Sequence, residues 1–260
     1  MKFSLIITNY NQKYGYGHYN RSKRLYDYLK KNVKIRFTSK PNKNEYKNYD
    51  NLIFDLPDYK NFLKGYKVRR GQKIIALDYN GKEKIDINYA IFSKSKNALL
   101  NYVSLENTFI EKLKFKKKNR QFSLIALGGY DRKKESLKIA KNIIKLFNIK
   151  VLIVYGPLNK KKTCIKEKKI KIIYNPKNFK KIQSECKFAV TNGGLTLKEM
   201  LSLKKSVFAI PQTPAEKKLC KKLKKHFKFN YGNISNLKFE KFKSKTNLKF
   251  KGLENFKKIL

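Results

Sequence analysis

The chain has 260 residues, of which 41% are hydrophobic, and its 64 basic and 18 acidic residues give a formal net charge of +46. This length and apolar content exclude a disordered chain and allow one large or two small domains with hydrophobic cores. No apolar run approaches the roughly 20 residues of a membrane-spanning helix, and the apolar start at residues 1–8 is too short for a signal peptide, so we expect a cytoplasmic protein.

The first half of the chain alternates short apolar runs with amphipathic segments. Ser22, Leu25 and Leu29 share one helical face and predict a helix over residues 18–31, and residues 61–67 predict a second helix. The apolar runs predict buried strands at residues 3–8, 33–37, 52–54 and 73–77. Strands that alternate with helices indicate a parallel sheet covered on both faces.

The same plan repeats after a less regular stretch at residues 101–121, which we interpret as a linker. Strands are predicted at residues 122–127, 151–155, 170–174 and 188–190, with helices at 134–147 and 178–184 and a strand, glycine turn and helix at 188–203. Beyond residue 228 the periodicity is weak, with short amphipathic pieces at 237–242 and 253–260. We therefore predict an α/β protein with two Rossmann-type domains, residues 1–118 and 119–260.

The first glycine loop ends at a histidine. In Tyr14-Gly-Tyr-Gly-His-Tyr-Asn-Arg21, Gly15 and Gly17 free the backbone, and His18 lies at the helix start, beyond the end of the first strand. A neutral imidazole there can act as a general base, although a lone histidine beside a loop is as often a surface residue. The other histidine, His226, lies in a lysine run and is given no role.

A second glycine turn follows the apolar run at residues 188–190. Gly193 and Gly194 let the backbone approach a ligand, Thr196 can cap the helix, and the N–H groups at its positive end favour a phosphate. Glu199, one turn further, is expected to be exposed and able to accept hydrogen bonds from sugar hydroxyls. The alternative is an ordinary strand-to-helix connection in which Glu199 only complements the helix dipole.

Two motifs carry a family resemblance. Gly194-Leu-Thr-Leu-Lys-Glu199, followed by Leu203 and the apolar residues 206–211, resembles the donor-nucleotide motif of GT-B glycosyltransferases of the peptidoglycan N-acetylglucosaminyl transferase type. Gly15-Tyr-Gly-His-Tyr-Asn-Arg21 resembles the N-terminal motif of the UDP-sugar hydrolases of pseudaminic acid biosynthesis. The resemblance implies a GT-B-like fold whose two domains face a cleft. It also implies a catalytic base at His18, substrate contacts at Gly15, Gly17 and Arg21, a ribose contact at Glu199, and diphosphate contacts at Gly193, Gly194, Leu195 and Thr196.

Weaker matches extend this resemblance, and some positions depart from it. Leu127-Gly-Gly-Tyr-Asp131 resembles the hydrolase loop that approaches the diphosphate, which implies substrate contacts at Gly128, Gly129 and Asp131. Leu52-Ile-Phe-Asp55 resembles an aspartate-ended strand of its N-terminal domain. This sequence departs from the family at several positions. Ile7 and Asn9 stand where an arginine and an aspartate are expected before the first loop, Pro57 stands where a tyrosine is expected, and Ala215-Glu216 stands where an Asn-Gln pair is expected. The half that is expected to bind the nucleotide therefore matches the family pattern better than the half that is expected to bind the sugar.

These residues predict hydrolysis of a UDP-linked acetamido sugar with release of UDP, in surface-glycan or nonulosonic acid biosynthesis. Transfer of the sugar to a glycan or lipid acceptor is the alternative, and a non-catalytic nucleotide-sugar-binding paralogue is another. No Asp-x-Asp motif occurs, so the sequence requires no divalent metal, and no cofactor is expected. The three cysteines form no Cys-x-x-Cys pair and are assigned to packing.

The charge itself suggests a nucleic-acid-binding protein as a further alternative. Only 7 of the 64 basic residues are arginine, and the lysines are spread along the chain, which favours a solvated lysine surface over a specific nucleic-acid face. The 17 tyrosines, which can stack on bases, keep that alternative open. We expect no specific nucleic acid partner, and a weak electrostatic attraction to anionic membranes.

Overall fold

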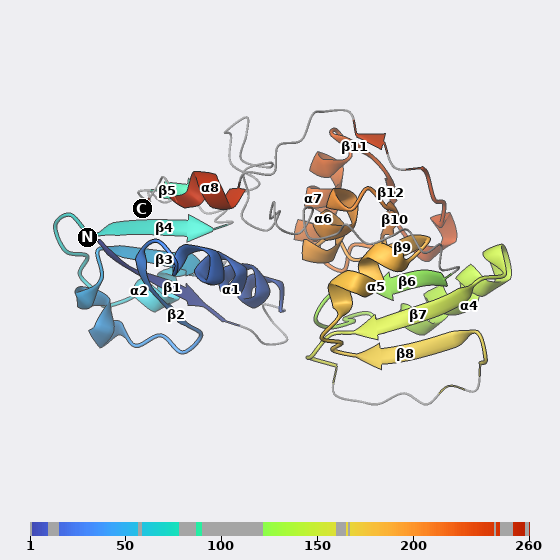
Figure 1. The fold of residues 1–260 in the computed structure, drawn as a ribbon, viewed down its shortest axis with the longest axis horizontal. Coiled ribbons are helices and arrows are strands. Elements are labelled where there is room, and N and C mark those ends of the chain that lie inside the picture. The colour runs from blue at the N-terminus through green and yellow to red at the C-terminus, as the bar shows by residue number, and fades with distance from the viewer. Residues whose placement is uncertain are drawn as a thin grey trace. The chain divides into compact units, whose positions relative to one another are not determined.

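A computed structural model describes residues 2–9, 16–56, 59–77, 87–89, 122–159, 165, 167–241, 243–244, 252–257 and 260. The chain divides into two compact units, and Figure 1 shows the elements of each. Unit 1 consists of Met1–Asn107 and Lys249–Leu260, and unit 2 of Thr108–Leu248. No helix in the described part of the chain is long and apolar enough to cross a membrane.

Unit 1 is built on a parallel sheet of order β2-β1-β3-β4-β5. Its strands are β1 (Phe3–Thr8), β2 (Lys34–Thr38), β3 (Asn51–Asp55), β4 (Lys73–Leu77) and β5 (Ile87–Tyr89). Alternate residues pack on opposite faces, as the period of a strand requires. Leu5 and Phe54 lie in the cluster formed with the 3-10 helix η1 (Lys43–Asn48) and α2 (Tyr59–Leu63), whereas Ile6 and Ile53 pack with α1 (Gly17–Leu29) and α8 (Gly252–Lys257).

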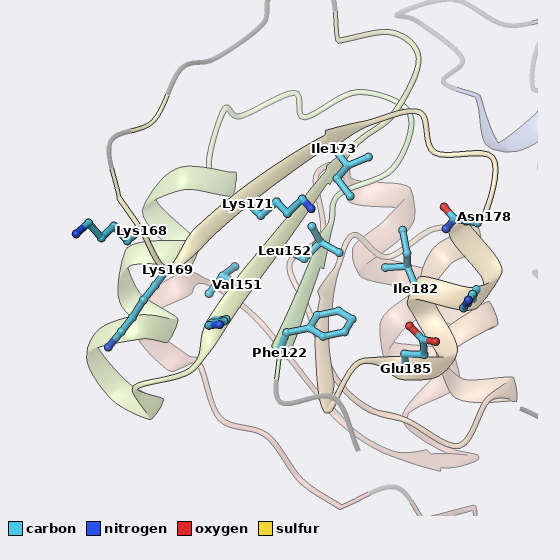
Figure 2. Close-up of a pocket in the computed structure, with 12 residues that line it drawn as sticks. Phe122, Val151, Leu152, Lys168, Lys169, Lys171, Ile173, Asn178, Ile182 and Glu185 are labelled. Carbon is cyan, nitrogen blue, oxygen red and sulfur yellow. The ribbon is translucent and has the colours of Figure 1, made fainter. Parts of the chain in front are cut away.

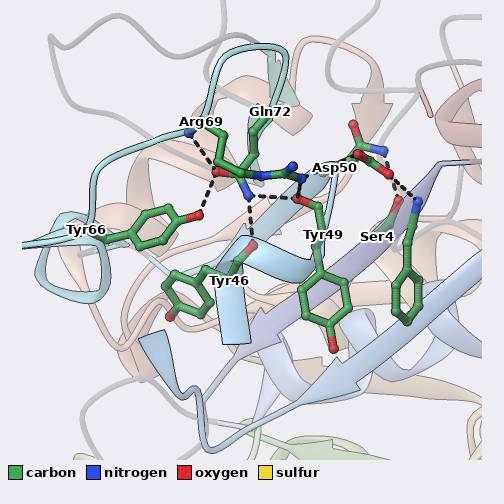
Figure 3. Close-up of polar contacts among 9 residues, drawn as sticks. Ser4, Tyr46, Tyr49, Asp50, Tyr66, Arg69 and Gln72 are labelled. Atoms are coloured by element: carbon green, nitrogen blue, oxygen red, sulfur yellow. Dashed lines mark hydrogen bonds and ion pairs between the residues drawn. The ribbon is translucent and has the colours of Figure 1, made fainter. Parts of the chain in front are cut away.

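A buried glutamine holds the amino-terminal edge of this sheet together (Figure 3). The Gln72 Nε2 donates to the Tyr46 and Tyr49 carbonyl oxygens at 2.8 and 2.7 Å, and its Oε1 accepts from the Tyr66 hydroxyl at 2.9 Å. At the same edge, the Phe3 N–H donates to the Asp50 Oδ2 at 2.8 Å. These bonds fix the connections opposite the carboxyl ends of the strands, where the candidate site lies.

Unit 2 is built on a six-stranded parallel sheet of order β12-β10-β9-β6-β7-β8. Its strands are β6 (Phe122–Ala126), β7 (Lys150–Tyr155), β8 (Ile170–Tyr174), β9 (Phe188–Thr191), β10 (Ser206–Ala209) and β12 (Asn230–Tyr231). A separate antiparallel pair joins β11 (Phe227–Lys228) to β13 (Lys243–Ser244). The helices are α4 (Ser136–Phe147), α5 (Phe179–Glu185), α6 (Leu195–Ser202) and α7 (Pro214–Leu223), with a 3-10 turn η2 (Ile234–Asn236). Ile139 and Ile143 of α4 pack on one face, against Ile125, Val151 and Ile153.

The predicted fold class is confirmed, and most predicted elements lie within two residues of their predicted bounds. The helix α7 was missed because Leu219, Cys220 and Leu223, its buried face, are set in a run of lysines. Residues 237–241 form no helix, and the assigned linker at 101–121 lies outside the described residues.

The end of the chain differs from the expected domain division. Residues 119–260 were expected to lie together, but Leu253 and Phe256 of α8 are buried in the unit 1 core beside Leu25 and Leu29 of α1. Cys186 and Cys220 are buried, as packing residues should be, and Cys164 lies outside the described residues.

Candidate functional site

Unit 1 brings a histidine and an aspartate together where its strand order reverses. The chain goes from β1 outward to β2 and then crosses to β3 on the other side of β1. Ligands of open α/β sheets bind at the carboxyl ends of the strands at such a switch point. Thr8 and Asp55, the last residues of β1 and β3, are paired in register, and α1 begins nearby with His18 in its first turn.

Asp55 is the centre of this cluster. Its side chain is 0% exposed, and it accepts hydrogen bonds from the Arg21 Nε and the Ser22 Oγ, both at 2.7 Å, and from the Arg21 Nη2. Burial opposes ionisation of Asp55, but the Arg21 guanidinium and then His18 outweigh that effect and hold the pKa of the carboxyl well below its usual range. The carboxylate is therefore charged throughout the neutral pH range.

His18 touches both members of this buried pair. Its Nδ1 lies 2.8 Å from the Asp55 Oδ1 and 2.8 Å from the Arg21 Nη2. A proton on Nδ1 donates to Asp55 and leaves Nε2 as the basic nitrogen, whereas a bare Nδ1 accepts from Arg21 and places the proton on Nε2. The side chain is 22% exposed, so solvent reaches the ring.

Sequence reasoning found part of this cluster. His18 and Arg21 were singled out and do lie together, Gly17 is the first residue of α1, and Gly15 lies outside the described residues. Ser22 was assigned only to packing, and Asp55 only to a strand end. Residues 18, 21 and 22 share a helical face, which was the available signal that one carboxylate could meet all three.

Unit 2 has its own switch point, between β6 and β9. From β6 the chain goes to β7 and β8 on one side and then returns to β9 on the other. Ala126 and Thr191 end these neighbouring strands in register, so the Gly128-Gly129 loop and the Asn192-Gly193-Gly194 turn both leave the same edge of the sheet. Both glycine segments therefore lie at the carboxyl edge of the sheet, where ligands of open α/β sheets bind.

The two glycine segments lie against each other without room for side chains. Gly128 has φ +92°, and a Cβ built there lies 2.9 Å from the Asn192 Nδ2. A Cβ on Gly193 lies 2.7 Å from the Glu216 Cβ. Positive φ at Gly128 and close contact at both positions explain why glycine is needed here.

The helix α6 begins at this edge without a capping side chain. Its N-cap residue is Gly194, which makes no side-chain cap hydrogen bond. Thr196 is buried inside the first turn, so the prediction that it caps the helix was wrong. The first N–H groups of a helix and its dipole favour an anion in general, and contact of Leu195 and Thr196 with a diphosphate stays a prediction.

Glu199 is not exposed, which corrects the sequence-based expectation. Only 4% of the residue is accessible, and its Oε2 accepts a hydrogen bond from the Gln183 Nε2 of α5 at 2.8 Å. Gln183 itself is 0% exposed. The carboxylate is therefore held in a fixed orientation by the neighbouring helix.

Asp131 caps a helix. Its Oδ2 accepts from the Ser136 N–H at 3.0 Å and the Ser136 Oγ at 2.6 Å, and its Oδ1 accepts from the Glu135 N–H at 3.2 Å. These bonds satisfy first-turn donors of α4 and tie the Gly128-Gly129 loop to that helix. A direct contact of the Asp131 carboxylate with a ligand stays a prediction.

Glu216 is a second carboxylate at this edge, and sequence reasoning missed it. Its Oε1 accepts from the Asn192 Nδ2 at 2.7 Å and its Oε2 from the Gln212 N–H at 2.6 Å, while its own N–H donates to the Thr213 Oγ1 at 3.2 Å. Burial raises the pKa of Glu216, against the lowering effect of these donors and of the Gly193 N–H. The Thr213-Pro-Ala-Glu216 capping box of α7 was the available sequence signal.

No group of three or more metal-ligating side chains occurs among the described residues. No protein-family model and no curated protein matches the chain by sequence.

Solved structures match the fold. The UDP-GlcNAc 2-epimerase of Methanocaldococcus jannaschii, in complex with UDP-GlcNAc and UDP, is similar with a TM-score of 0.60 and 11% identity over 100% of this chain and 99% of that chain. Arabidopsis thaliana UGT89C1, complexed with UDP-L-rhamnose, has a TM-score of 0.51 and 10% identity over 90% and 86% of the two chains. The UDP-N-acetylglucosamine 2-epimerase of Rickettsia bellii has a TM-score of 0.50 and 12% identity over 82% and 80%. The two parallel-sheet units therefore have a GT-B-type fold.

Proposed function

We propose that the protein binds a UDP-linked sugar and releases UDP from it by hydrolysis. The observation that carries this proposal is the edge of unit 2 where two closely packed glycine segments meet the uncapped start of α6. The His18–Asp55 pair at the switch point of unit 1 adds a candidate base. Structures with the same fold contain UDP or UDP-sugars, which supports the nucleotide assignment.

The nucleotide part of the ligand is assigned to unit 2. The N–H groups of Gly194, Leu195 and Thr196 contact the diphosphate. Gly128 and Gly129 have no side chains, so the diphosphate can approach their backbone closely. Glu199 accepts a hydrogen bond from a ribose hydroxyl. A carboxylate accepts several hydrogen bonds, so the bond from Gln183 orients Glu199 for this role.

The chemical step is assigned to His18. With its Nδ1 proton donated to Asp55, the Nε2 removes a proton from water, and the water oxygen bonds to the anomeric carbon as the bond from that carbon to the diphosphate oxygen breaks. UDP leaves with the electron pair of that bond, and the helix dipole and N–H groups of α6 stabilise its charge. A sugar or lipid hydroxyl in place of water makes the same step a glycosyl transfer. An acetamido sugar of surface-glycan biosynthesis is the substrate class we propose.

One observation favours a second candidate, a nucleotide-sugar-binding protein without catalysis. The Arg21 Nη2 is as close to the His18 Nδ1 as Asp55 is, at 2.8 Å. If Nδ1 accepts from Arg21, the proton lies on Nε2, and the ring has no basic nitrogen for a nucleophile.

The test compares the two histidines. UDP release from a panel of UDP-linked acetamido sugars is measured for the wild type, for His18→Asn and for the control His226→Asn, with UDP affinity measured by calorimetry. A general base acts in the transition state, so His18→Asn should lower turnover by about a hundredfold to ten-thousandfold with little change in UDP affinity. The control should match the wild type.

The products separate the candidate functions. Release of UDP and free sugar in water supports the hydrolase, and release only with an added acceptor supports a transferase. A changed sugar stereochemistry supports an epimerase, and tight binding without any product supports the non-catalytic candidate. UDP release that His18→Asn leaves unchanged contradicts the role of His18.

A further inference from the structure

A pocket with a volume of ≈ 490 Å³ lies in unit 2, on the side of the sheet away from α4 (Figure 2). Its floor is apolar, and Figure 2 shows Phe122, Leu152 and Ile173 of the strands β6, β7 and β8 on one side with Ile182 of α5 facing them. A volume of this size is in the range of small-molecule sites, roughly 300–1,000 Å³. The proposed function gives this pocket no role.

The crossover from β7 to β8 carries no helix in its described part. The β6-to-β7 connection contains α4 and the β8-to-β9 connection contains α5, but residues 156–159, 165 and 167–169, between β7 and β8, form no helix. Val151 and Ile153 face α4 and are buried, whereas Leu152, between them, points to the other face and is only partly buried. Apolar surface is therefore left in an accessible pocket.

The rim of the pocket is strongly basic. Its lining includes one acidic residue, Glu185, and five lysines: Lys150, Lys168, Lys169, Lys171 and Lys181. Lys169 donates to the Asn148 Oδ1. Within the described part of the chain, none of the other four lysines forms an ion pair with a carboxylate. An apolar floor with a basic rim is complementary to a ligand that has an apolar chain and an anionic head.

A second observation lies at the same end of the unit. Phe122 and Lys150 begin their strands, and Lys168 and Lys169 directly precede β8, so this part of the pocket lies at the amino-terminal edge of the sheet. Leu146 and Phe147, at the end of α4 just before Lys150, are 56% and 43% exposed. The only other large hydrophobic side chain exposed among the described residues is Val68 of unit 1. Apolar side chains among lysines are typical of surfaces that contact lipid.

From these observations we propose that this edge of unit 2 docks on an anionic membrane and that the pocket holds an anionic phospholipid. The alkyl chain lies on Phe122, Leu152 and Ile182, the phosphate lies among the rim lysines, and Leu146 and Phe147 enter the interface. The glycine segments are at the opposite, carboxyl edge of the same strands, so docking leaves them accessible. This proposal does not depend on the identity of the reaction.

Vesicle flotation tests the proposal, with phosphatidylcholine vesicles compared with vesicles that also contain phosphatidylglycerol. The pocket variant is Lys150→Glu with Lys171→Glu, and its matched control is Lys217→Glu with Lys221→Glu, two exposed lysines of α7 that give the same change of charge. The apolar variant is Leu146→Ser, with Val68→Ser as its control. Thermal unfolding of each variant shows whether the fold is intact, and this measurement requires neither UDP binding nor the proposed reaction.

The wild type should bind only the anionic vesicles. The pocket variant should bind them at least about tenfold more weakly, because each lysine near an anionic surface adds to the attraction. The α7 control and Val68→Ser should bind nearly as the wild type, while Leu146→Ser should bind more weakly. Dodecyl phosphate should displace the protein from vesicles, and glycerol 3-phosphate at the same concentration should not.

Three results would overturn the proposal. Equal losses for the pocket variant and the α7 control would mean that net charge alone drives binding. Displacement by glycerol 3-phosphate as effective as by dodecyl phosphate would leave the apolar floor without a role. Displacement by polyglutamate with the same dependence on the pocket lysines, and none on Leu146, would point to an acidic protein segment.

Discussion

At the scale of single residues, the carboxylates of Asp55 and Glu216 behave in opposite ways. Asp55 is fully buried and Glu216 is half-buried, and the loss of contact with water disfavours the charged form of each. Asp55 contacts a guanidinium, whose charge reverses the effect and lowers its pKa. Glu216 is bonded mainly to neutral donors, Asn192 and the N–H groups of Gln212 and Gly193, and its pKa stays raised. Asp55 is therefore a charged carboxylate beside His18 at neutral pH.

Replacing Asp55 tests this charge. Asp55→Asn should lower the free energy of unfolding by about 3–5 kcal/mol, because it leaves the buried Arg21 guanidinium without its carboxylate. The folded pKa of Asp55 is below the unfolded value of about 3.9, so its stabilisation is fully present above that value and is lost as the pH falls through the folded pKa. Urea unfolding at neutral pH and at a series of acidic pH values measures both effects.

Asp27→Asn is the control for Asp55→Asn. Asp27 contacts Lys23 and Lys30, but its side chain is 46% exposed, and exposed ion pairs contribute little. If Asp55→Asn costs no more stability than Asp27→Asn, the buried cluster is not held as described.

Glu199→Gln tests the nucleotide site while keeping the size of the side chain. The amide can still accept a hydrogen bond from Gln183, but it loses the charge, and UDP affinity should fall by about 1.5–3 kcal/mol, the range for a hydrogen bond to a charged group. Calorimetry measures the affinity, and thermal unfolding shows whether the fold is intact. Unchanged UDP affinity in a folded variant would remove Glu199 from the site. Glu199→Ala is less informative, because it also leaves the buried Gln183 amide without this acceptor.

At the scale of elements, the site depends on how closely two loops approach. Gly128 combines φ +92° with a position at which an added Cβ would meet the Asn192 side chain, so the turn before α6 lies close beside the loop after β6. The order of strands in the sheet brings these loops together, although residues 128 and 192 are far apart in the chain.

Gly128→Ala should therefore lower both stability and UDP affinity. The positive φ alone costs about 1–3 kcal/mol, and the added Cβ pushes Asn192 away from its position. Gly71→Ala is the matched control, because Gly71 has φ +80° but nothing within 4 Å of an added Cβ. Thermal unfolding and UDP calorimetry should show a loss of stability in both variants and a loss of affinity only in Gly128→Ala. Equal UDP affinities in the two variants would contradict the role of this loop.

Helices and strands whose apolar residues follow a clear local pattern could be predicted from the sequence. Apolar runs such as those of β1 and β4 are bounded by polar residues, and their predicted bounds match the structure. The helix α7 was hidden because its four lysines outnumber its three buried residues.

The contacts of the site were less predictable because they depend on tertiary packing. Asp55 reaches Arg21 only through the strand order, and Glu199 is buried because Gln183 of α5 packs beside it. Motif resemblance located His18 and Glu199, but it gave no information about these partners.

At the scale of the whole molecule, the chain is not two units in simple succession. Unit 2 comprises residues 108–248 and is inserted into unit 1, whose core is completed by α8. Phe256 is 0% exposed in that core, beside Ile6, Leu25 and Ile53. The last helix therefore contributes to the unit that carries His18.

Phe256→Ala should destabilise unit 1 selectively. Truncation of a buried phenylalanine costs about 3–5 kcal/mol, and Phe256 belongs to the hydrophobic cluster of unit 1. Hydrogen exchange should increase in peptides from β1 and α1 and stay unchanged in peptides from β6 and β9. Lys257→Ala, at an exposed position of the same helix, is the control and should leave both sets unchanged. Faster exchange in β6 and β9 as well would show that the units unfold together.

The return of the chain to unit 1 has a consequence for biosynthesis. Domains usually fold in the order in which they leave the ribosome, the N-terminal one first. Here the strands of unit 1 are synthesised first, but Leu253 and Phe256 emerge only after all of unit 2 has been made. The apolar face formed by Ile6, Leu25 and Leu29 must therefore wait for α8 throughout the synthesis of unit 2. During translation the first half of the chain thus cannot mature until the last helix has been made, and until then its uncovered apolar face is available to chaperones and to aggregation.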